Sequence, residues 1–153
     1  MNAARQKGVI FAPVVLDVGL GTFRPVKVDD ITQHQMHTER YHISADTAQI
    51  INDALRDGRR IIATGTTSLR TLEGCFAKHG VIKAVTDETN IFIYPPYQFK
   101  VISGLITNFH LPKSTLLMLV AAFVGRDKVL ELYELAKQSN FRFYSFGDCM
   151  FLQ

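Results

Sequence analysis

The 153 residues are 47% hydrophobic and 20% charged, as expected for one globular domain with a sizeable core, and no internal repeat or low-complexity tract divides them. The net charge of +3 comes from basic residues spread along the chain, which permits an anionic partner without requiring one. The longest apolar run, residues 116–124, is too short to cross a bilayer, and no signal-type segment follows Met1, so we expect a cytoplasmic protein without membrane contact. The two cysteines lie far apart, which gives no support to a disulfide framework or a zinc cluster.

Residues 12–18 are predicted to form a buried strand, and the following GLGT sequence at 19–22 predicts a sharp turn with exposed backbone amides. A Gly-x-Gly turn after a strand resembles a phosphate-binding turn. It lacks the third glycine, however, and a plain tight turn explains it better. The candidate ligand-binding residues in this region are Gly19, Gly21, Thr22 and Arg24.

A polar segment rich in histidine follows at residues 29–41. His34 and His37 are three residues apart and form a possible metal pair on a helix, but no third ligand stands at a defined spacing. Solvated histidines are the commoner explanation of such a pattern. His37 and Glu39 remain candidates for contacting a polar ligand.

The next predicted helix is a surface helix that begins after Ser44, an N-cap residue, and ends at Gly58. A short strand at 61–64 then leads into GTTS at 65–68, which opens another helix. Free amides and the positive end of the helix dipole make such a junction an anion site, with Arg70 one turn inside. Hydroxyl N-caps with Arg70 paired to Glu73 explain the same pattern equally well.

The remaining elements are predicted strands at 89–94 and 141–146, an extended run to residue 102 and an amphipathic helix at 127–139. Strands that alternate with helices predict an α/β fold with a mostly parallel sheet flanked by helices. In such a fold, Asp148 is expected at the same sheet edge as the loops at 65–68 and 107–115.

Five reactive side chains lie within eight residues of the segment 104–119, between a short apolar strand and an apolar helix. Polar groups at a strand-to-helix junction are typical of binding sites in α/β proteins. For single residues a structural explanation is equally good, with Ser114 as a helix cap and His110 as a loop residue. The five side chains are Asn108, His110, Lys113, Ser114 and Thr115.

Six segments together resemble one family, the S-adenosylmethionine:tRNA ribosyltransferase-isomerases of queuosine biosynthesis. The segment TNFHLPKSTLLML at 107–119 is the most specific of them. The six segments are LDVGLGTFRPV (16–26), MHTERY (36–41), GTTSLRTLE (65–73), TNIFIYPPYQFKV (89–101), LITNFHLPKSTLLMLVAAFVG (105–125) and FRFYSFGDCMF (141–151).

The resemblance implies a transferase that donates the ribosyl group of S-adenosylmethionine rather than its methyl group. The implied acceptor is 7-aminomethyl-7-deazaguanine at the wobble position of a tRNA, and the products are epoxyqueuosine, adenine and methionine. S-Adenosylmethionine is then a substrate, and no permanently bound cofactor is implied.

The family pattern is longer than this chain, whose residues 1–153 correspond to the C-terminal part of its α/β domain. The resemblance implies that the N-terminal part and a small inserted β-barrel domain are absent, so a second chain is a possible partner. The alternative is a truncated, inactive or partner-dependent fragment that retains only tRNA or nucleotide binding. Asp17 stands where the family usually has histidine, which places any catalytic role of residue 17 in doubt.

The implied reaction needs a base to remove a proton from the ribose 5′ carbon beside the sulfonium. His110 is the first candidate because an imidazole titrates near neutral pH, and Asp148 and His37 are the alternatives. Positively charged side chains suit a tRNA phosphate or the methionine carboxylate. The residues assigned to substrate or cofactor binding are Gly19, Gly21, Thr22, Arg24, Glu39, Thr66, Thr67, Ser68, Arg70, Asn108, Lys113 and Ser114, and no metal ligand is assigned.

Overall fold

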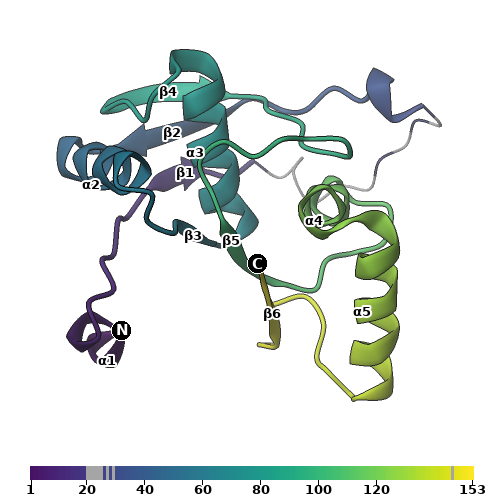
Figure 1. Cartoon of the computed structure of the whole chain (residues 1–153). Coiled ribbons are helices and arrows are strands. Elements are labelled where there is room, and N and C mark those ends of the chain that lie inside the picture. Colours follow the sequence, from purple (N-terminus) through teal and green to yellow (C-terminus); the bar gives the residue numbers. More distant parts are fainter. Residues whose placement is uncertain (20–25, 27, 29, 146) are drawn as a thin grey trace.

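A computed structural model of the chain describes residues 1–19, 26, 28, 30–145 and 147–153. It shows a mixed α/β fold with two small sheets, which confirms the combination of helices and strands in the predicted fold class (Figure 1). No helix in these described ranges is long and apolar enough to cross a membrane. In chain order the elements are α1 (Asn2–Gln6), β1 (Val15–Asp17), a 3₁₀ helix (Ile31–Gln33), β2 (Glu39–Ile43), α2 (Ala45–Arg56), β3 (Ile62–Thr64), α3 (Thr66–His79), β4 (Val85–Thr89), β5 (Gly104–Asn108), α4 (Thr115–Val124), α5 (Arg126–Gln138) and β6 (Cys149–Leu152).

The first sheet has the strand order β1-β2-β4, and both pairings are antiparallel. Side chains alternate along β2, where Glu39, Tyr41 and Ile43 are buried and Arg40 and His42 are exposed. Because successive residues of a strand point to opposite faces, this register places the Glu39 carboxylate on the buried face.

The second sheet has the order β3-β5-β6, with β3 parallel to β5 and β6 antiparallel to β5. The prediction of a mostly parallel sheet is therefore wrong for the described strands, of which only β3 and β5 form a parallel pair. A parallel pair needs a crossover that returns the chain to the same sheet. Here α2 and α3 instead lead from one sheet to the other, and among the described strands only the long connection from β3 to β5 ends in a parallel pair.

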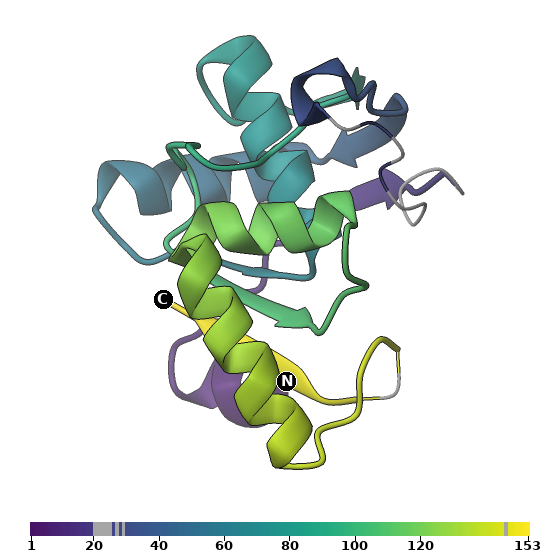
Figure 2. The ribbon, with the colours of Figure 1, turned by 90° about the vertical axis from the view of Figure 1, so that its right-hand side faces the viewer.

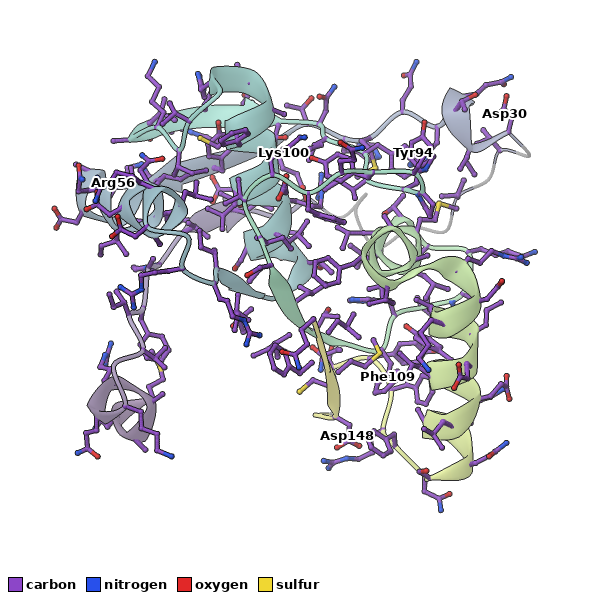
Figure 3. All side chains as sticks on the ribbon, in the orientation of Figure 1. Asp30, Arg56, Tyr94, Lys100, Phe109 and Asp148 are labelled. Carbon is purple, nitrogen blue, oxygen red and sulfur yellow. The ribbon has the colours of Figure 1, made fainter. Side chains whose placement is uncertain are left out.

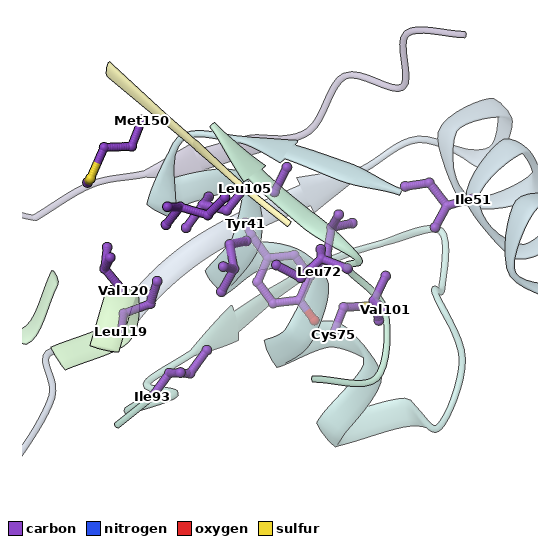
Figure 4. Close-up of a cluster of buried hydrophobic side chains, with 14 of the residues drawn as sticks. Tyr41, Ile51, Leu72, Cys75, Ile93, Val101, Leu105, Leu119, Val120 and Met150 are labelled. Carbon is purple, nitrogen blue, oxygen red and sulfur yellow. The ribbon is translucent and has the colours of Figure 1, made fainter. Parts of the chain in front are cut away.

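Helix α3 lies between the two sheets and contacts strands of both (Figure 1). Its residues Leu69, Leu72 and Cys75 are buried, and they pack in one cluster with Tyr41 of β2 and Leu105 of β5 (Figure 4). The helix begins after Gly65, as the sequence predicts, and ends at Gly80, which has a φ of 70°.

The middle of α3 approaches β4 very closely. A Cβ atom at Gly74 would lie 2.4 Å from the Thr89 hydroxyl oxygen, so only glycine fits between this helix and this strand. The predicted strand at 89–94 is wrong, because β4 ends at Thr89 and residues 90–103 form no strand. A buried side chain of α3, Glu73, holds this loop instead, as described below.

Helices α4 and α5 follow one another and are separated by Gly125, whose φ is 91° (Figure 2). The predicted strand at 141–146 is also wrong, since residues 141–145 form no strand and the last strand is β6, at Cys149–Leu152. Asn140 and Tyr144 have φ values of 56° and 63°. This left-handed conformation interrupts extended backbone, so a strand cannot run through the segment.

Candidate functional site at one edge of the β3-β5-β6 sheet

The segments with candidate site residues meet where β3 and β5 end and β6 begins. The Gly65 amide donates a hydrogen bond of 2.8 Å to the Ile106 carbonyl, and the Asn108 side-chain amide donates one of 3.0 Å to the Asp148 carbonyl. Figure 3 shows Phe109 and Asp148 on the same side of the molecule, beside α5 and β6. The prediction that Asp148 lies at the same edge as the loops at 65–68 and 107–115 is thus confirmed, although Asp148 precedes a strand rather than following one.

His110 lies in the loop between β5 and α4 and is held at two points. Its imidazole Nε2 lies 2.8 Å from the Thr107 hydroxyl, and its backbone amide donates to the Tyr133 hydroxyl of α5 at 2.7 Å. Burial lowers the pKa of His110 to about 4, because a charged imidazolium is poorly solvated there. The ring is therefore neutral at pH 7.

Tyr133 and Thr107 were not among the predicted site residues, yet they fix the position of His110. Burial raises the pKa of Tyr133, so its hydroxyl stays protonated at neutral pH and also donates to the His110 carbonyl at 3.3 Å. The spacing of Thr107, three residues before a histidine in a tight loop, is the signal that could have identified it. Tyr133 is 23 residues from His110, and no local signal connects them.

Ser114 is the N-cap of α4, which confirms its structural role. Its hydroxyl accepts a hydrogen bond from the Leu117 amide at 3.1 Å and donates one to the Leu111 carbonyl at 2.7 Å. Lys113 is exposed with a φ of 58°, and its carbonyl accepts from the Val26 amide at 3.0 Å. The Thr115 hydroxyl is buried and has no hydrogen-bond partner among the described residues.

The start of α3 has no side-chain cap. Gly65 is the N-cap, with a φ of 86°, while the Ser68 hydroxyl turns back to the Thr64 carbonyl at 2.8 Å. The explanation by hydroxyl N-caps is therefore wrong for this helix. No side chain among the described residues caps its first amides, which together with the positive end of the helix dipole suit an anion.

Arg70 forms a buried ion pair with Glu39 of β2, and only 2% of each residue is exposed. The predicted alternative, an ion pair with Glu73 on the same helix, is wrong. The other Glu39 oxygen accepts a hydrogen bond from the Gly19 amide at 3.2 Å, so the pair connects α3, β2 and the turn after β1. Arg70 Nε and Nη2 are buried and have no partner among the described residues.

Side chains on a helix point toward its N-terminus, and Thr66 lies four residues before Arg70, on the same face. From this general geometry we expect the Arg70 nitrogens that have no partner among the described residues to lie toward the N-terminal half of α3. Buried N–H groups without acceptors are rare in proteins and carry a free-energy cost of about 1–3 kcal/mol each. An anionic ligand at this end of the helix would satisfy both sets of donors.

Asp148 is occupied by Arg142. Its carboxylate accepts from the Arg142 backbone amide at 2.5 Å and from the Arg142 guanidinium at 3.2 Å. The hydrogen bonds from Arg142 hold the pKa of Asp148 below its usual range, so the group is ionised at pH 7.

The remaining predicted residues are not joined to this arrangement. His37 is exposed and makes no hydrogen bond or ion pair within the part of the chain that the structure describes. His34 packs edge-on against Phe92, with ring centroids 5.3 Å apart, rather than forming a site with His37. Across residues 1–19, 26, 28, 30–145 and 147–153, no group of three or more His, Cys, Asp or Glu residues could hold a metal ion. Gly21, Thr22 and Arg24 lie outside the described residues.

Comparison with known proteins confirms the resemblance. A family model described as "Queuosine biosynthesis protein" matches residues 1–152. The S-adenosylmethionine:tRNA ribosyltransferase-isomerases of Fusobacterium nucleatum and Desulfitobacterium hafniense are each 52% identical to this chain over 152 residues, which is 99% of this chain and 43% and 45% of those proteins.

A crystal structure of S-adenosylmethionine tRNA ribosyltransferase from Thermotoga maritima superimposes with a TM-score of 0.77 at 42% identity. The match covers 99% of this chain and 48% of that one. The chain thus spans less than half the length of these relatives. Since the family model covers almost every residue, this chain belongs to the queuosine biosynthesis protein family.

Proposed function

We propose that this chain is part of an S-adenosylmethionine:tRNA ribosyltransferase-isomerase and carries the sheet edge at which the reaction takes place. The names of the two curated relatives support the activity. The observation that carries the assignment to this edge is Arg70 of α3, whose buried Nε and Nη2 have no partner among the described residues, on a helix that begins without a side-chain cap. Neither feature is needed for the fold, and both suit a ligand with a negative charge.

The proposed reaction transfers the ribosyl group of S-adenosylmethionine to the aminomethyl group of 7-aminomethyl-7-deazaguanine in tRNA. The positive sulfur acidifies the neighbouring C5′–H bond, so a base can remove that proton. The ribosyl group then forms epoxyqueuosine, and adenine and methionine leave. This chemistry takes place in the cytoplasm, where tRNA is available.

His110 is the proposed base because it is neutral at pH 7 and anchored at the sheet edge. A pKa of about 4 makes an imidazole a weak base, but an anionic substrate group beside it would raise that pKa toward neutrality. Asp148 is ionised but already bound to Arg142, and His37 is exposed, so both are weaker candidates.

The anion at Arg70 and the 65–68 amides is proposed to be the methionine carboxylate or a tRNA phosphate. Lys113, which is exposed, suits a phosphate of the tRNA backbone. Asn108 uses one amide proton on the Asp148 carbonyl and has a second donor and an acceptor for a base edge or for the same carboxylate. The amide of Gly19 donates to Glu39. Gly21, Thr22 and Arg24 remain proposed substrate-binding residues on the basis of the sequence alone.

The half of the relatives that this chain does not match is proposed to be required for activity, and to include an inserted β-barrel. In this proposal residues 1–153 are the C-terminal part of the α/β domain, and the complementary part comes from a second chain. A fragment that only binds tRNA or a nucleotide is the alternative, favoured by the 43–45% coverage of the relatives.

Adenine release tests the proposal. The chain is assayed alone and with the part of the Fusobacterium nucleatum protein that it does not match, using S-adenosylmethionine and an anticodon stem-loop carrying 7-aminomethyl-7-deazaguanine. We expect release only with both polypeptides and the stem-loop. Stem-loop binding without release by the combined polypeptides, while the full-length relative is active, would support the binding fragment.

The role of His110 is tested in the same assay by His110→Gln, with exposed Lys128→Gln on α5 as the matched control. Loss of a general base lowers turnover by roughly 100-fold or more. Near-normal turnover in His110→Gln would eliminate this residue as the base and leave Asp148 and His37.

A further inference from the structure

The hydroxyl of Thr107 and the imidazole of His110 form a hydrogen bond at the end of β5. The Thr107 Oγ1 and His110 Nε2 atoms are 2.8 Å apart, and only 3% of Thr107 is exposed. Neither side chain has another hydrogen-bond partner among the described residues. The Nδ1 atom of His110 is therefore the ring nitrogen that no group in the described part of the chain occupies.

The position of the His110 ring is fixed on both sides. The Tyr133 hydroxyl accepts a hydrogen bond from the His110 amide at 2.7 Å and donates one to its carbonyl at 3.3 Å, which holds the backbone. Rotation of the ring by half a turn would place Cε1 instead of Nε2 opposite the Thr107 hydroxyl, and a buried hydroxyl without a partner is costly. The orientation with Nε2 toward Thr107 is therefore the stable one.

The partner of one imidazole nitrogen determines what the other nitrogen can do, because a neutral ring has one N–H group and one lone pair. A hydroxyl both donates and accepts, so Thr107 can bond to Nε2 whether or not this nitrogen carries a proton. When Nδ1 takes up a proton, both ring nitrogens carry one, and the Thr107 oxygen accepts from Nε2–H. Burial lowers the pKa of His110 by disfavouring the charged ring, and this hydrogen bond opposes that effect.

A second hydrogen bond between a threonine and a histidine provides the comparison. In the first sheet, His42 Nδ1 of β2 lies 2.8 Å from the Thr86 hydroxyl of β4. Both residues are exposed, so water can replace this hydrogen bond at little cost. The two hydrogen bonds have the same length and differ in burial. At His110, Thr107 is the only group among the described residues that satisfies Nε2.

We propose that Thr107 is a positioning residue, which occupies Nε2 of His110 and leaves Nδ1 as the atom that takes the proton from the substrate. This rests on the proposed function, in which His110 is the base. An N–H bond forms at Nδ1 as the C5′–H bond of S-adenosylmethionine breaks, and the electron pair stays on C5′ beside the positive sulfur. Thr107 acts in this step only through His110.

Nitrogen NMR of the chain alone, with isotopically labelled histidine, tests the contact without any reaction. The chain has five histidines, and His110→Gln identifies the signals of residue 110. We expect Thr107→Val to shift the ring nitrogen resonances of His110, and Thr107→Ser, which keeps the hydroxyl, to leave them in place. Thr86→Val is the matched control and should shift only those of His42. Unchanged His110 resonances in Thr107→Val would overturn the proposal.

The adenine-release assay with both polypeptides identifies the reacting nitrogen. Replacing His110 by Nδ1-methylhistidine blocks Nδ1 but keeps the contact of Nε2 with Thr107, so we expect turnover to fall roughly 100-fold without a change in urea unfolding. Thr107→Val should lower turnover about tenfold with KM unchanged, since the charged ring loses a hydrogen bond. Thr107→Ser and Thr86→Val should stay within about twofold of the wild type.

Near-normal turnover with Nδ1-methylhistidine, where His110→Gln is inactive, would make Nε2 the reacting atom and overturn the proposal. Equal turnover in Thr107→Val and Thr86→Val would overturn it as well. Absence of adenine release from the wild type would contradict the proposed function instead, and the NMR measurement would still decide whether Thr107 occupies Nε2.

Discussion

Two buried carboxylates beside α3 differ in how they are satisfied. Glu73, on the helix, accepts hydrogen bonds from the backbone amides of Lys100, Val101 and Ile102 and from the Tyr97 hydroxyl. Glu39, on β2, faces Arg70, and two N–H groups of that arginine have no partner among the described residues.

This difference in hydrogen bonding distinguishes a carboxylate with a structural role from one that belongs to a ligand-binding site. Around Glu73 the loop amides point at one carboxylate, which fixes residues 97–102 on α3. In the Arg70–Glu39 pair, by contrast, the buried Nε and Nη2 of Arg70 have no acceptor among the described residues. A buried ion pair is also often no more stabilising than apolar residues of similar volume. The first arrangement therefore holds the fold together, and the second is better explained by a ligand.

The largest expected effect comes from Glu73→Gln. A carboxamide has one acceptor oxygen and turns an NH₂ group toward the loop amides, so at least two buried donors lose their acceptor. We expect the free energy of unfolding in urea to fall by about 4 kcal/mol. Glu88→Gln, at an exposed position of β4, is the control and should change it by less than about 0.5 kcal/mol. If Glu73→Gln lowered the free energy of unfolding by less than about 1 kcal/mol, Glu73 would not have the structural role that distinguishes it from Glu39.

The second prediction concerns Arg70→Met, alone and with Glu39→Met. The single variant leaves a buried carboxylate without its counterion and should lose about 3 kcal/mol of unfolding free energy. The double variant removes both charges and the unpartnered donors, so it should return to within about 1 kcal/mol of the wild type. It should nevertheless lose adenine release. A double variant that loses as much unfolding free energy as Arg70→Met, or more, would show that the pair is retained for stability.

Local sequence signals predicted the helix ends well, because a cap acts over three or four residues. Ser44 caps α2 and Ser114 caps α4, as expected. The same local rule failed for Arg70, which pairs with a residue 31 positions away rather than with Glu73. Glu73 is not available to it, because a loop brought in by the fold occupies its carboxylate.

The wrong strands have a similar cause. Residues 89–94 are apolar enough for a strand, but their backbone is part of a loop anchored on α3, while the polar segment Val85–Thr89 pairs with β2. The candidate site was predictable as a set of segments, since parallel β3 and β5 end at one edge. The residues that hold His110 in place were not all predictable, because the Tyr133 hydroxyl contacts His110 only as a result of the packing of α5.

The third prediction is a pH dependence from His110. Its pKa is about 4 in the folded chain and about 6.5 when unfolded, so the unfolded state binds more protons between these values and stability falls as the pH falls through this window. We expect a loss of about 2 kcal/mol between pH 7 and pH 5 beyond that of His110→Gln. Parallel pH profiles for the two proteins in urea unfolding would contradict the lowered pKa.

The smallest effect distinguishes two helix caps. Both Ser44 and Ser114 accept from an amide three residues ahead, but Ser114 is also buried and donates to the Leu111 carbonyl. Ser44→Ala should cost about 1 kcal/mol of unfolding free energy, the usual value for a lost cap, and Ser114→Ala about 1 kcal/mol more. Thermal or urea unfolding of both variants measures this difference. Both hydrogen bonds of the Ser114 hydroxyl are made within the protein, so we assign this residue a structural role like that of Glu73 rather than a ligand-binding role like that of Arg70. An equal loss of unfolding free energy in the two variants would contradict this structural role and favour a Ser114 hydroxyl that binds the ligand.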